Sequence, residues 1–495
     1  MNANVNAGII TDALQRAGLL QAVRGNLPAH FAAITTDSRA VTDGALFVAV
    51  HGSSRDGHAF LPQGAAAGAA AVIVSDAAST ELPSIIVSDT RRAVAVAAAA
   101  WYGHPASQLR LVAVTGTNGK TTSASMLRCL LSTEAQPAAS IGTLGMLIGA
   151  AGRAHPGGDG LTTPGPVELQ KLLRELCDAG VHWVALEASS HALQQHRLDG
   201  LRFDAALFTN FTRDHIDYHG TMEAYFAAKA MLLDQLADTA VVITNADDPA
   251  WDALPPTPHR RLRYSAGAHV ADVYARRIEF TNVGSSFSLH APSTGAVKVQ
   301  LPLLGDFQVD NAVGVAAVCI GLGLSVSVVV SRLSAMPQVP GRLERLSTSP
   351  AVLRDYAHTP DALQRALQSV RPFASGRVIV VFGAGGDRDR GKRPEMGRVA
   401  ASLADVCIVT SDNPRTEDPA RIIDDIVAGM PRNTVVREQD RLQAITHAIT
   451  MAGPDDLVLL AGKGHETYQI RGTTRHPFDE AEIVAGIVAA LTAAR

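Results

Sequence analysis

A glycine-rich turn that runs into Lys-Thr is the clearest chemical signal in the sequence. The segment Thr115-Gly-Thr-Asn-Gly-Lys-Thr-Thr122 follows an apolar run at 111–114 and precedes apolar residues at helical spacing. Backbone N–H groups at such a helix start bind phosphate, lysine neutralises phosphate charge, and a threonine hydroxyl ligates Mg²⁺. The predicted phosphate-binding loop comprises Gly116, Thr117, Asn118, Gly119, Lys120, Thr121 and Thr122. A plain helix-capping turn is the alternative, because Val114 stands where the general pattern has its first glycine.

Two further polar segments follow apolar runs that we expect to be strands. Glu187 begins Glu-Ala-Ser-Ser-His, and its carboxylate is suited to Mg²⁺, although a solvated glutamate at a strand end explains it equally well. The segment 209–219 is rich in Asp and His. The spacing of His215 and His219 allows a zinc site, but without a His-Glu-x-x-His motif a magnesium–nucleotide site is favoured.

Three loops in the last third of the chain carry charged and polar residues after predicted strands. The strands are 378–382, 406–409 and 457–460, and the loops are 383–393, 411–415 and 461–466. The first loop fails the dinucleotide-binding pattern, because Arg388 stands at its third glycine. Each loop alone could be an ordinary turn, but the carboxyl ends of parallel strands meet at one edge. We therefore predict one convergent site for an anionic ligand.

The elements that position these residues fall into three blocks of an α/β protein. Breaks at Tyr102-Gly-His-Pro and Pro337-Gln-Val-Pro-Gly separate residues 1–105, 106–339 and 340–495. Short apolar strands alternate with helical segments in the second and third blocks, which is typical of parallel sheets covered on both faces. We expect a smaller α/β N-terminal domain, a central phosphate-loop domain with a parallel sheet, and a Rossmann-like C-terminal domain.

Composition excludes several classes of protein. The 495 residues include 43 Lys and Arg against 47 Asp and Glu, so no basic surface for nucleic acid or anionic membranes is expected. The four cysteines are far apart, which disfavours disulfides and cysteine-based zinc sites. No secretory signal is evident, and the apolar stretches 93–102 and 312–324 are too short to cross a membrane, so we expect them to be core helices. A cytoplasmic protein is expected.

The motifs resemble those of the Mur ligases, the ATP-dependent amide-forming enzymes of peptidoglycan assembly. The resemblance spans essentially the whole chain. Besides the phosphate loop it rests on Thr36-Asp-Ser-Arg39, Thr162-Thr-Pro164, Glu187-Ala-Ser-Ser-His191, Asn210, Asp214-His215, Pro340-Gly-Arg-Leu-Glu344 and Asp355-Tyr-Ala-His-Thr-Pro360. The segment Asp412-Asn-Pro-Arg415 matches the tag that marks users of diaminopimelate, as against lysine, in this family. Folylpolyglutamate synthetases share the phosphate loop but are not expected to carry that tag.

The resemblance implies a reaction and its catalytic residues. ATP would phosphorylate the D-glutamyl carboxylate of UDP-N-acetylmuramoyl-L-Ala-D-Glu, and an amine of meso-diaminopimelate would attack the resulting acyl phosphate. The implied catalytic residues are Lys120, Glu187, His215 and Lys229, and the implied magnesium ligands are Thr121, Glu187, His215 and Lys229. Lys229 matches the family lysine that carries a carbamate derived from CO₂, whereas by itself it would be taken for a solvated helix lysine.

The resemblance also implies the binding residues. For the uridine nucleotide they are Thr36, Ser38, Ser53, Ser54 and Arg55; for the muramoyl dipeptide, Thr162, Thr163, Ser189, Gln195 and Arg197; and for the ATP base and ribose, Asn311, Arg342 and Asp355. The amino-acid pocket would comprise Arg388, Asp412, Asn413, Pro414, Arg415, Gly462 and Glu466. Arg415 can clamp the distal carboxylate of diaminopimelate, and Glu466 is suited to its ammonium. Lysine lacks that carboxylate and would leave Arg415 unpaired.

Departures from the family pattern are few. Gln308 stands where Asn is common, and Thr36 where Leu is frequent. Two other functions stay open: a non-catalytic nucleotide-binding protein of the same fold, and a ligase for L-lysine or another amine. We expect a monomer whose partners are small molecules, with no nucleic acid and no membrane.

Overall fold

The structure is a computed structural model that describes residues 4–52, 55–76, 80–158, 160–267, 269–281, 283–292, 294–431 and 435–493. The chain forms two compact units. Unit 1 comprises Met1–Tyr274 and Gly314–Val329, and unit 2 comprises Ala275–Val313 and Val330–Arg495. The predicted boundaries at residues 105 and 339 differ from this partition and stay predictions. No helix in the described part of the chain is both long and apolar enough to cross a membrane.

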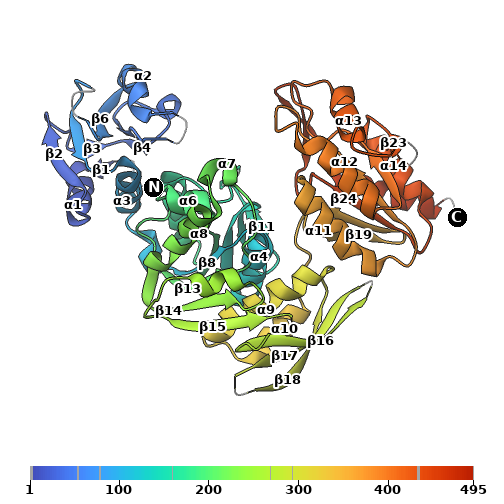
Figure 1. Ribbon diagram of the computed structural model, residues 1–495. Coiled ribbons are helices and arrows are strands. Elements are labelled where there is room, and N and C mark those ends of the chain that lie inside the picture. The colour runs from blue at the N-terminus through green and yellow to red at the C-terminus, as the bar shows by residue number, and fades with distance from the viewer. Residues whose placement is uncertain are drawn as a thin grey trace. The chain divides into compact units, whose positions relative to one another are not determined.

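The first sheet of unit 1 carries helices on both faces (Figure 1). Its order is β2 (Leu20–Arg24), β7 (Ser84–Val87), β6 (Ala69–Val74), β5 (Ala45–Val48) and β4 (Ala33–Thr35), with α1 (Ala7–Arg16), α2 (Leu61–Ala66) and α3 (Thr90–Trp101) around it. Side chains of a strand point alternately to opposite faces, so Leu46 and Val48 pack with α1 and α3, while Phe47 packs with α2. The helix predicted at 93–102 is confirmed as α3.

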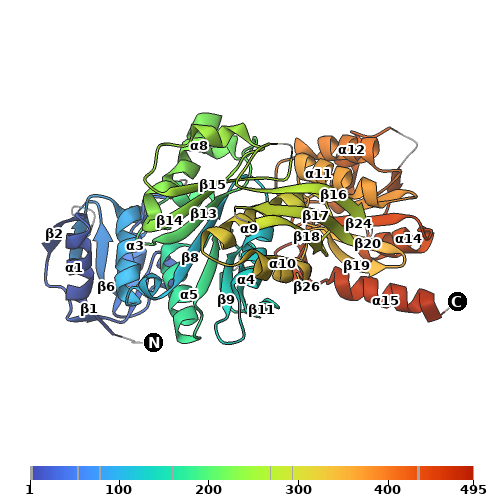
Figure 2. The same ribbon diagram turned by 90° about the horizontal axis from the view of Figure 1, so that it is seen from below.

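The second sheet of unit 1 places the carboxyl ends of neighbouring parallel strands at one edge. Within unit 1, the strand order of this sheet is β11 (Arg153–His155), β10 (Gly145–Ile148), β9 (Ala138–Gly142), β12 (Trp183–Glu187), β8 (Arg110–Thr115), β13 (Phe203–Phe208), β14 (Leu236–Asn245) and β15 (Arg260–Ser265). Strands β9, β12, β8, β13, β14 and β15 are parallel. Figure 2 shows β8, β13 and β14 side by side. The strands predicted at 111–114, 183–186, 205–208 and 241–243 are all confirmed.

Helices and short strands complete unit 1. They are β1 (Val5–Asn6), β3 (His30–Phe31), α4 (Lys120–Leu131), α5 (Pro166–Asp178), α6 (Ser190–Gln194), α7 (Ile216–His219) and α8 (Met222–Ala230). Leu169, Leu172 and Leu176 recur on one face of α5 and are buried against the sheet. Three elements are shared between the units by sequence: β16 (Val273–Thr281), α9 (Asp306–Gly321) and α10 (Val326–Ser334). The predicted helix at 312–324 corresponds to the later part of α9.

Unit 2 contains a six-stranded sheet with helices on both faces. Its order is β19 (Glu344–Thr348), β20 (Ala351–Asp355), β24 (Leu457–Ala461), β21 (Val378–Phe382), β22 (Val406–Val409) and β23 (Val435–Arg437). Alternate residues of β21 face opposite layers. Val380 packs with α11 (Pro360–Val370), α12 (Lys392–Leu403) and α13 (Pro419–Val427), and Val381 packs with α14 (Arg441–Met451) and α15 (Glu480–Ala493). The strands predicted at 378–382, 406–409 and 457–460 are confirmed.

Unit 2 also contains two hairpins. Strand β17 (Gly284–Ala291) pairs with β18 (Thr294–Leu301), and β25 (Tyr468–Arg471) pairs with β26 (Thr474–Pro477), both antiparallel. The second hairpin also contacts the loop after β22, because Arg415 N donates to Ile470 O. This contact holds the hairpin beside the loop that carries Asp412, Asn413 and Arg415.

We expect Leu367→Ala to lower the free energy of unfolding by about 2–5 kcal/mol, because the fully buried side chain would leave a cavity between α11 and the sheet. Thermal unfolding of the full chain measures the effect. Leu442→Ala is the matched control, since Leu442 is 41% exposed on α14. Equal shifts for the two variants would contradict the packing described here.

Candidate functional site

The loop after β8 depends on two glycines. Gly116 has φ 145°, and a Cβ added there would lie 1.9 Å from Thr209 Oγ1. Gly119 has φ 84° and is the N-cap of α4, so the loop turns directly into the helix. The first N–H groups of α4 therefore begin at the carboxyl edge of the sheet, where the helix dipole favours an anion.

Hydrogen bonds from the loop after β13 hold this backbone in place. Thr117 N donates to Asn210 O at 2.7 Å, and Asn118 N donates to Asn210 Oδ1 at 2.9 Å. In return, Thr209 Oγ1 donates to Asn118 O at 2.6 Å. The phosphate-binding conformation is thus shaped by the neighbouring strand end as well as by its own glycines.

Lys120 folds back across the loop. Its Nζ donates to Gly116 O at 2.9 Å and to Thr117 O at 2.8 Å. The ammonium therefore lies over the backbone that would receive a phosphate, as the sequence predicts for the lysine of such a loop. Thr122, also predicted in this loop, is buried in the first turn of α4.

Glu187 is a buried carboxylate that joins three segments. Thr121 Oγ1 donates to Glu187 Oε2 at 3.1 Å, Thr143 N donates to Oε1 at 2.8 Å, and Thr143 Oγ1 donates to Oε2 at 3.2 Å. The carboxylate is 2% exposed. A carboxylate beside a hydroxyl is a pair of hard oxygen donors, so these residues fit Mg²⁺. The structure thus brings together Thr121 and Glu187, two of the four predicted metal ligands.

Lys229 lies on the other side of the loop, on α8. Thr221 caps that helix by accepting from Ala224 N, and the side chain of Lys229 is directed inward, where it is 1% exposed. Its Nζ donates to Gly116 O at 2.8 Å and lies 4.4 Å from the centre of the Tyr225 ring. Burial and the nearby Lys120 lower the pKa of the Lys229 ammonium well below its ordinary value. This shift favours the neutral amine of Lys229 over its ammonium form.

His215 occupies the edge of this cluster. Its side chain is 46% exposed and lies 3.5 Å from Asp214 Oδ2, with its ring centre 4.7 Å from that of His191. Burial lowers the pKa of His215, and that of His191 falls to about 4 through burial and the neighbouring histidines. His219 is instead hydrogen-bonded to Ser190 Oγ at 2.9 Å, which gives the zinc alternative no support.

The predicted dipeptide-binding residues form one hydrogen-bonded network. Thr163 Oγ1 donates to Glu187 O at 2.7 Å and lies 3.1 Å from Ser189 Oγ, and Arg197 donates to Thr163 O at 2.9 Å. Arg197 also donates twice to Gln195 Oε1, at 3.1 and 2.7 Å. Thr162 joins more loosely, at 3.5 Å from Thr143 Oγ1. The network connects the backbone carbonyl of Glu187 to the partly exposed guanidinium of Arg197.

The predicted uridine-binding residues lie with the first sheet. Thr36 is exposed, whereas Ser38 is buried and donates to Gln63 Oε1 at 2.9 Å. Arg55 is exposed, and its carbonyl accepts from Gly52 N at 3.0 Å. Ser53 and Ser54 lie outside the described residues. The role of these five positions stays a prediction.

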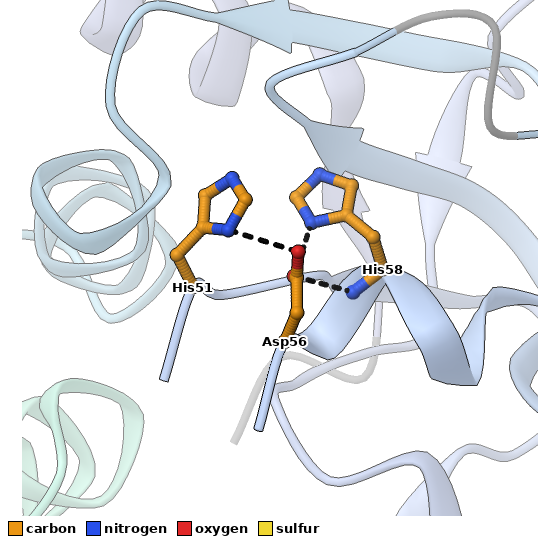
Figure 3. Close-up of side chains that lie close together, drawn as sticks. All are labelled: His51, Asp56 and His58. Atoms are coloured by element: carbon orange, nitrogen blue, oxygen red, sulfur yellow. Dashed lines mark hydrogen bonds and ion pairs between the residues drawn. The ribbon is translucent and has the colours of Figure 1, made fainter. Parts of the chain in front are cut away.

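Next to them, His51, Asp56 and His58 form the one group of three or more metal-capable side chains within the described residues (Figure 3). Asp56 lies 3.0 Å from His51 Nδ1 and 2.7 Å from His58 Nδ1. Ser75 N donates to His58 Nε2 at 3.1 Å, so the proton of that neutral ring must be on Nδ1, directed at Asp56. A cation between His58 and Asp56 would have to displace this proton. These hydrogen bonds therefore link His51, before residue 53, to Asp56 and His58, after residue 54.

In unit 2, Asp355 organises the predicted nucleoside residues. It is buried at the end of β20, where Oδ2 accepts from Leu343 N at 2.8 Å and Oδ1 accepts from Ala357 N at 2.9 Å. Burial raises the pKa of Asp355. Arg342 lies 5.3 Å from the centre of the Tyr356 ring, and its carbonyl accepts from Gln308 Nε2 at 3.2 Å. Asn311, the third predicted residue, is buried on α9.

The loops after β22 and β24 meet in a charged pocket. Asn413 Nδ2 donates to Glu466 Oε2 at 2.8 Å, and Asp412 lies 3.4 Å from the ammonium of Lys463. Gly462 N donates to Asp355 O at 3.0 Å, and a Cβ on Gly462 would lie 3.3 Å from Asp412 Oδ2. The third predicted loop meets them as well, because Gly386 N in the loop after β21 donates to Asn413 O at 2.9 Å. The three loops thus converge, and their role as one ligand site stays a prediction.

Arg415 is fixed beside this pocket by its backbone. It has φ 54°, its N donates to Ile470 O at 3.1 Å, and its carbonyl accepts from Gly472 N at 2.7 Å. Its guanidinium donates to Gly386 O at 2.9 Å, in the loop after β21. The Pro414 carbonyl lies against Gly386. A Cβ added at Gly386 would be 1.9 Å from the Pro414 carbonyl oxygen. Arg388 is exposed, and its side chain donates to Asp387 O rather than to the pocket.

The sequence did not indicate four residues of these sites as binding or catalytic candidates: Asn210, Thr143, Tyr218 and Lys463. Asn210 and Tyr218 lie in the segment singled out for its Asp and His, and Tyr218 OH accepts from Gln195 Nε2 at 2.9 Å. Thr143 follows β9, a strand that was not predicted. For Lys463, the sequence feature that could have indicated a role is its position between two glycines after β24.

Comparison with known families covers most of the chain. The model described as the Mur ligase family catalytic domain matches residues 30–118, the Mur ligase middle domain matches 114–319, and the Mur ligase glutamate ligase domain matches 341–464. The first two meet at the phosphate loop, and the third includes Asp355, Asp412 and Arg415.

Individual relatives match over nearly their full length. The UDP-N-acetylmuramoyl-L-alanyl-D-glutamate–2,6-diaminopimelate ligase of Gloeobacter violaceus is 43% identical over 466 residues, covering 92% of this chain and 94% of the relative. The Synechococcus elongatus protein of the same name is 44% identical over 481 residues, covering 94% and 95%. A solved structure bearing that name has a TM-score of 0.69 at 33% identity and covers 99% of both chains.

We expect Gly116→Ala to weaken binding of Mg-ATP at least about tenfold, because the added methyl group would collide with Thr209 Oγ1 and distort the loop. Isothermal titration calorimetry measures the dissociation constant. Gly486→Ala is the control, since nothing lies within 4 Å of a Cβ at that position on α15. An unchanged affinity in Gly116→Ala would refute the assignment of this loop to phosphate.

Proposed function

This chain belongs to the Mur ligase family, and we propose that it joins meso-diaminopimelate to the D-glutamyl carboxylate of UDP-N-acetylmuramoyl-L-Ala-D-Glu at the expense of ATP. The observation that carries the proposal is the similarity, at 43% identity over 92% of the chain, to a relative named for that reaction. The charged pocket around Asp412 and Arg415 supports the same choice of amine. A non-catalytic role is disfavoured, because Lys120, Glu187 and Lys229 are all held around the phosphate loop.

The first step brings like charges together. A substrate carboxylate attacks the γ-phosphorus of ATP, so an acyl phosphate forms and ADP leaves. The Lys120 ammonium and the N-terminus of α4 would offset the negative charge that accumulates on the phosphoryl oxygens. Thr121 and Glu187 would hold Mg²⁺, which supplies further charge neutralisation when bound. The network of Thr163, Gln195 and Arg197 would orient the dipeptide near Glu187.

The second step needs an amine held at the acyl phosphate. Attack by nitrogen forms the amide bond, breaks the acyl carbon–oxygen bond and releases inorganic phosphate, and the amine loses a proton. Arg415 would clamp the distal carboxylate of diaminopimelate, and Glu466 would accept from its distal ammonium. Lysine has no distal carboxylate. Its binding would leave the Arg415 guanidinium without a charged partner, and this would select against lysine.

Lys229 would carry the carbamate that the family resemblance implies. Only the neutral form of an amine reacts with CO₂, and the lowered pKa of Lys229 favours that form. The product would be a carboxylate-like group in place of a cation, next to Gly116 and Lys120. Such a group suits a second cation site better than the ammonium does.

We expect ¹³C NMR of the full chain, equilibrated with ¹³C-bicarbonate, to show a carbamate resonance that Lys229→Arg abolishes. Its intensity should decrease as the pH falls, because protonation removes the reactive neutral amine. Lys171→Arg is the control, since the Lys171 side chain is 49% exposed. A resonance that survives Lys229→Arg would assign the carbamate to another lysine.

The function itself is tested by offering the purified chain Mg-ATP, UDP-N-acetylmuramoyl-L-Ala-D-Glu and equal concentrations of meso-diaminopimelate and L-lysine. We expect mass spectrometry to show the diaminopimelate adduct and release of ADP. Arg415→Ala should reduce kcat/KM for diaminopimelate by about 10–100-fold, which corresponds to the loss of a charged hydrogen bond.

Two other outcomes would change this assignment. A lysine adduct that Arg415→Ala leaves unimpaired would keep the ligase chemistry and overturn the choice of amine. ATP binding without any adduct would favour the non-catalytic alternative. Arg388→Ala is the comparison variant. The Arg388 side chain is exposed and lies outside the hydrogen-bonded pocket, so Arg388→Ala should change kcat/KM less than Arg415→Ala does.

A further inference from the structure

Lys463 is a fully buried lysine in the middle of the charged pocket. Its side chain is 0% exposed, and Nζ lies 3.1 Å from Asn413 Oδ1, 3.2 Å from Glu466 Oε2 and 3.4 Å from Asp412 Oδ1. Removing an ammonium from water is costly unless it is paired and hydrogen-bonded. The contacts with these three side chains therefore stabilise the buried ammonium of Lys463.

The two flanking glycines make the inward direction of Lys463 possible. Gly462 has φ 115° and Gly464 has φ 53°, conformations that favour glycine. A Cβ on Gly464 would lie 2.6 Å from the Cβ of Tyr356. The chain after β24 can thus turn sharply and direct the lysine under the loop that follows β22.

Lys463 fixes the orientation of the Asn413 amide. Asn413 Oδ1 accepts from Lys463 Nζ and from Ile470 N, the latter at 2.9 Å, so this atom must be the oxygen. Asn413 Nδ2 consequently donates to Glu466 Oε2 at 2.8 Å. Glu466 Oε2 thus accepts from two groups, whereas Oε1 accepts no hydrogen bond from the described residues. The Glu466 side chain keeps 16% exposure.

The charges of the pocket are set by the same contact. Asp412, Glu466 and Lys463 together carry a net charge of −1, and the Arg415 guanidinium beside them adds one positive charge. The arrangement suits a ligand that brings one ammonium and one carboxylate. Burial raises the pKa of Asp412, but nearby cations, first among them Lys463, bring it below its ordinary value. The Asp412 carboxylate therefore favours its ionised form before any ligand arrives.

We propose that Lys463 is a positioning residue for the amine substrate: through Asn413 and Glu466 it presents Glu466 Oε1 to the ammonium of the incoming amino acid. The inference rests on the proposed function, because it takes diaminopimelate as the ligand of this pocket. Lys463 contacts neither the reacting amine nor ATP in this role, so its removal should affect amino-acid affinity selectively.

Steady-state kinetics of Lys463→Met tests the proposal. The KM for meso-diaminopimelate should rise at least tenfold, while the KM values for ATP and for UDP-N-acetylmuramoyl-L-Ala-D-Glu stay within twofold. Leu367→Ala is the control for general destabilisation, and it should lower the unfolding temperature without that selective rise. If Lys463→Met does not accumulate as folded protein, Lys463→Gln removes the same charge and should give the same selectivity.

A double variant shows whether Lys463 acts through Glu466. Glu466→Gln alone should raise the KM for diaminopimelate, and adding Lys463→Met should raise it by less than the product of the two single effects. Multiplicative effects would mean that the two residues act independently, which overturns the proposal.

The remaining outcomes separate the two hypotheses. If wild-type protein makes the diaminopimelate product but Lys463→Met raises all three KM values alike, or lowers only kcat, the positioning role is wrong and the proposed function stands. If wild-type protein makes no diaminopimelate product, the proposed function fails and the role of Lys463 fails with it.

Discussion

A single buried carboxylate, that of Glu187, joins the parts of the phosphate site. It accepts from Thr121 on α4 and from Thr143 after β9, and its backbone carbonyl accepts from Thr163. These contacts bring the helix that would bind phosphate and the residues that would bind the acceptor to adjacent strand ends. Because an isolated buried carboxylate is costly, the donors from Thr121 and Thr143 also stabilise the arrangement. In unit 2 a positive group links two loops in a similar way. The ammonium of Lys463 contacts Asp412 after β22 and Glu466 after β24.

The sequence predicted the strands and the loops that follow them because buried parallel strands read as continuous apolar runs. The membership of the Mur ligase family and the α/β fold with several parallel sheets are confirmed. The inward direction of Lys463 could not be predicted, since it depends on backbone angles at Gly462 and Gly464 and on the position of Tyr356. Thr143 was missed for a related reason: its importance comes from strand β9 lying beside β12, which no local pattern encodes.

Two departures from expected patterns have structural explanations. Val114 replaces the first glycine of the general phosphate-loop pattern, yet it lies within β8, pairs in register with Glu187, and its carbonyl accepts from Ala188 N at 2.8 Å. A regular strand at this position needs no glycine. Gln308 stands where asparagine is common, and its longer side chain reaches Arg342 O at 3.2 Å. Both substitutions therefore keep the local geometry by different contacts.

Gly116 O accepts from both Lys120 Nζ and Lys229 Nζ, at 2.9 and 2.8 Å. Two full positive charges on one carbonyl dipole repel each other, and burial together with the nearby Lys120 lowers the pKa of Lys229 well below its ordinary value. A polyanion at the loop would stabilise the ammonium form of an unmodified Lys229, whereas a carbamate on Lys229 would need Mg²⁺ to offset its negative charge beside the polyanion. Occupancy of this loop is therefore thermodynamically linked to pH, to CO₂ and to Mg²⁺.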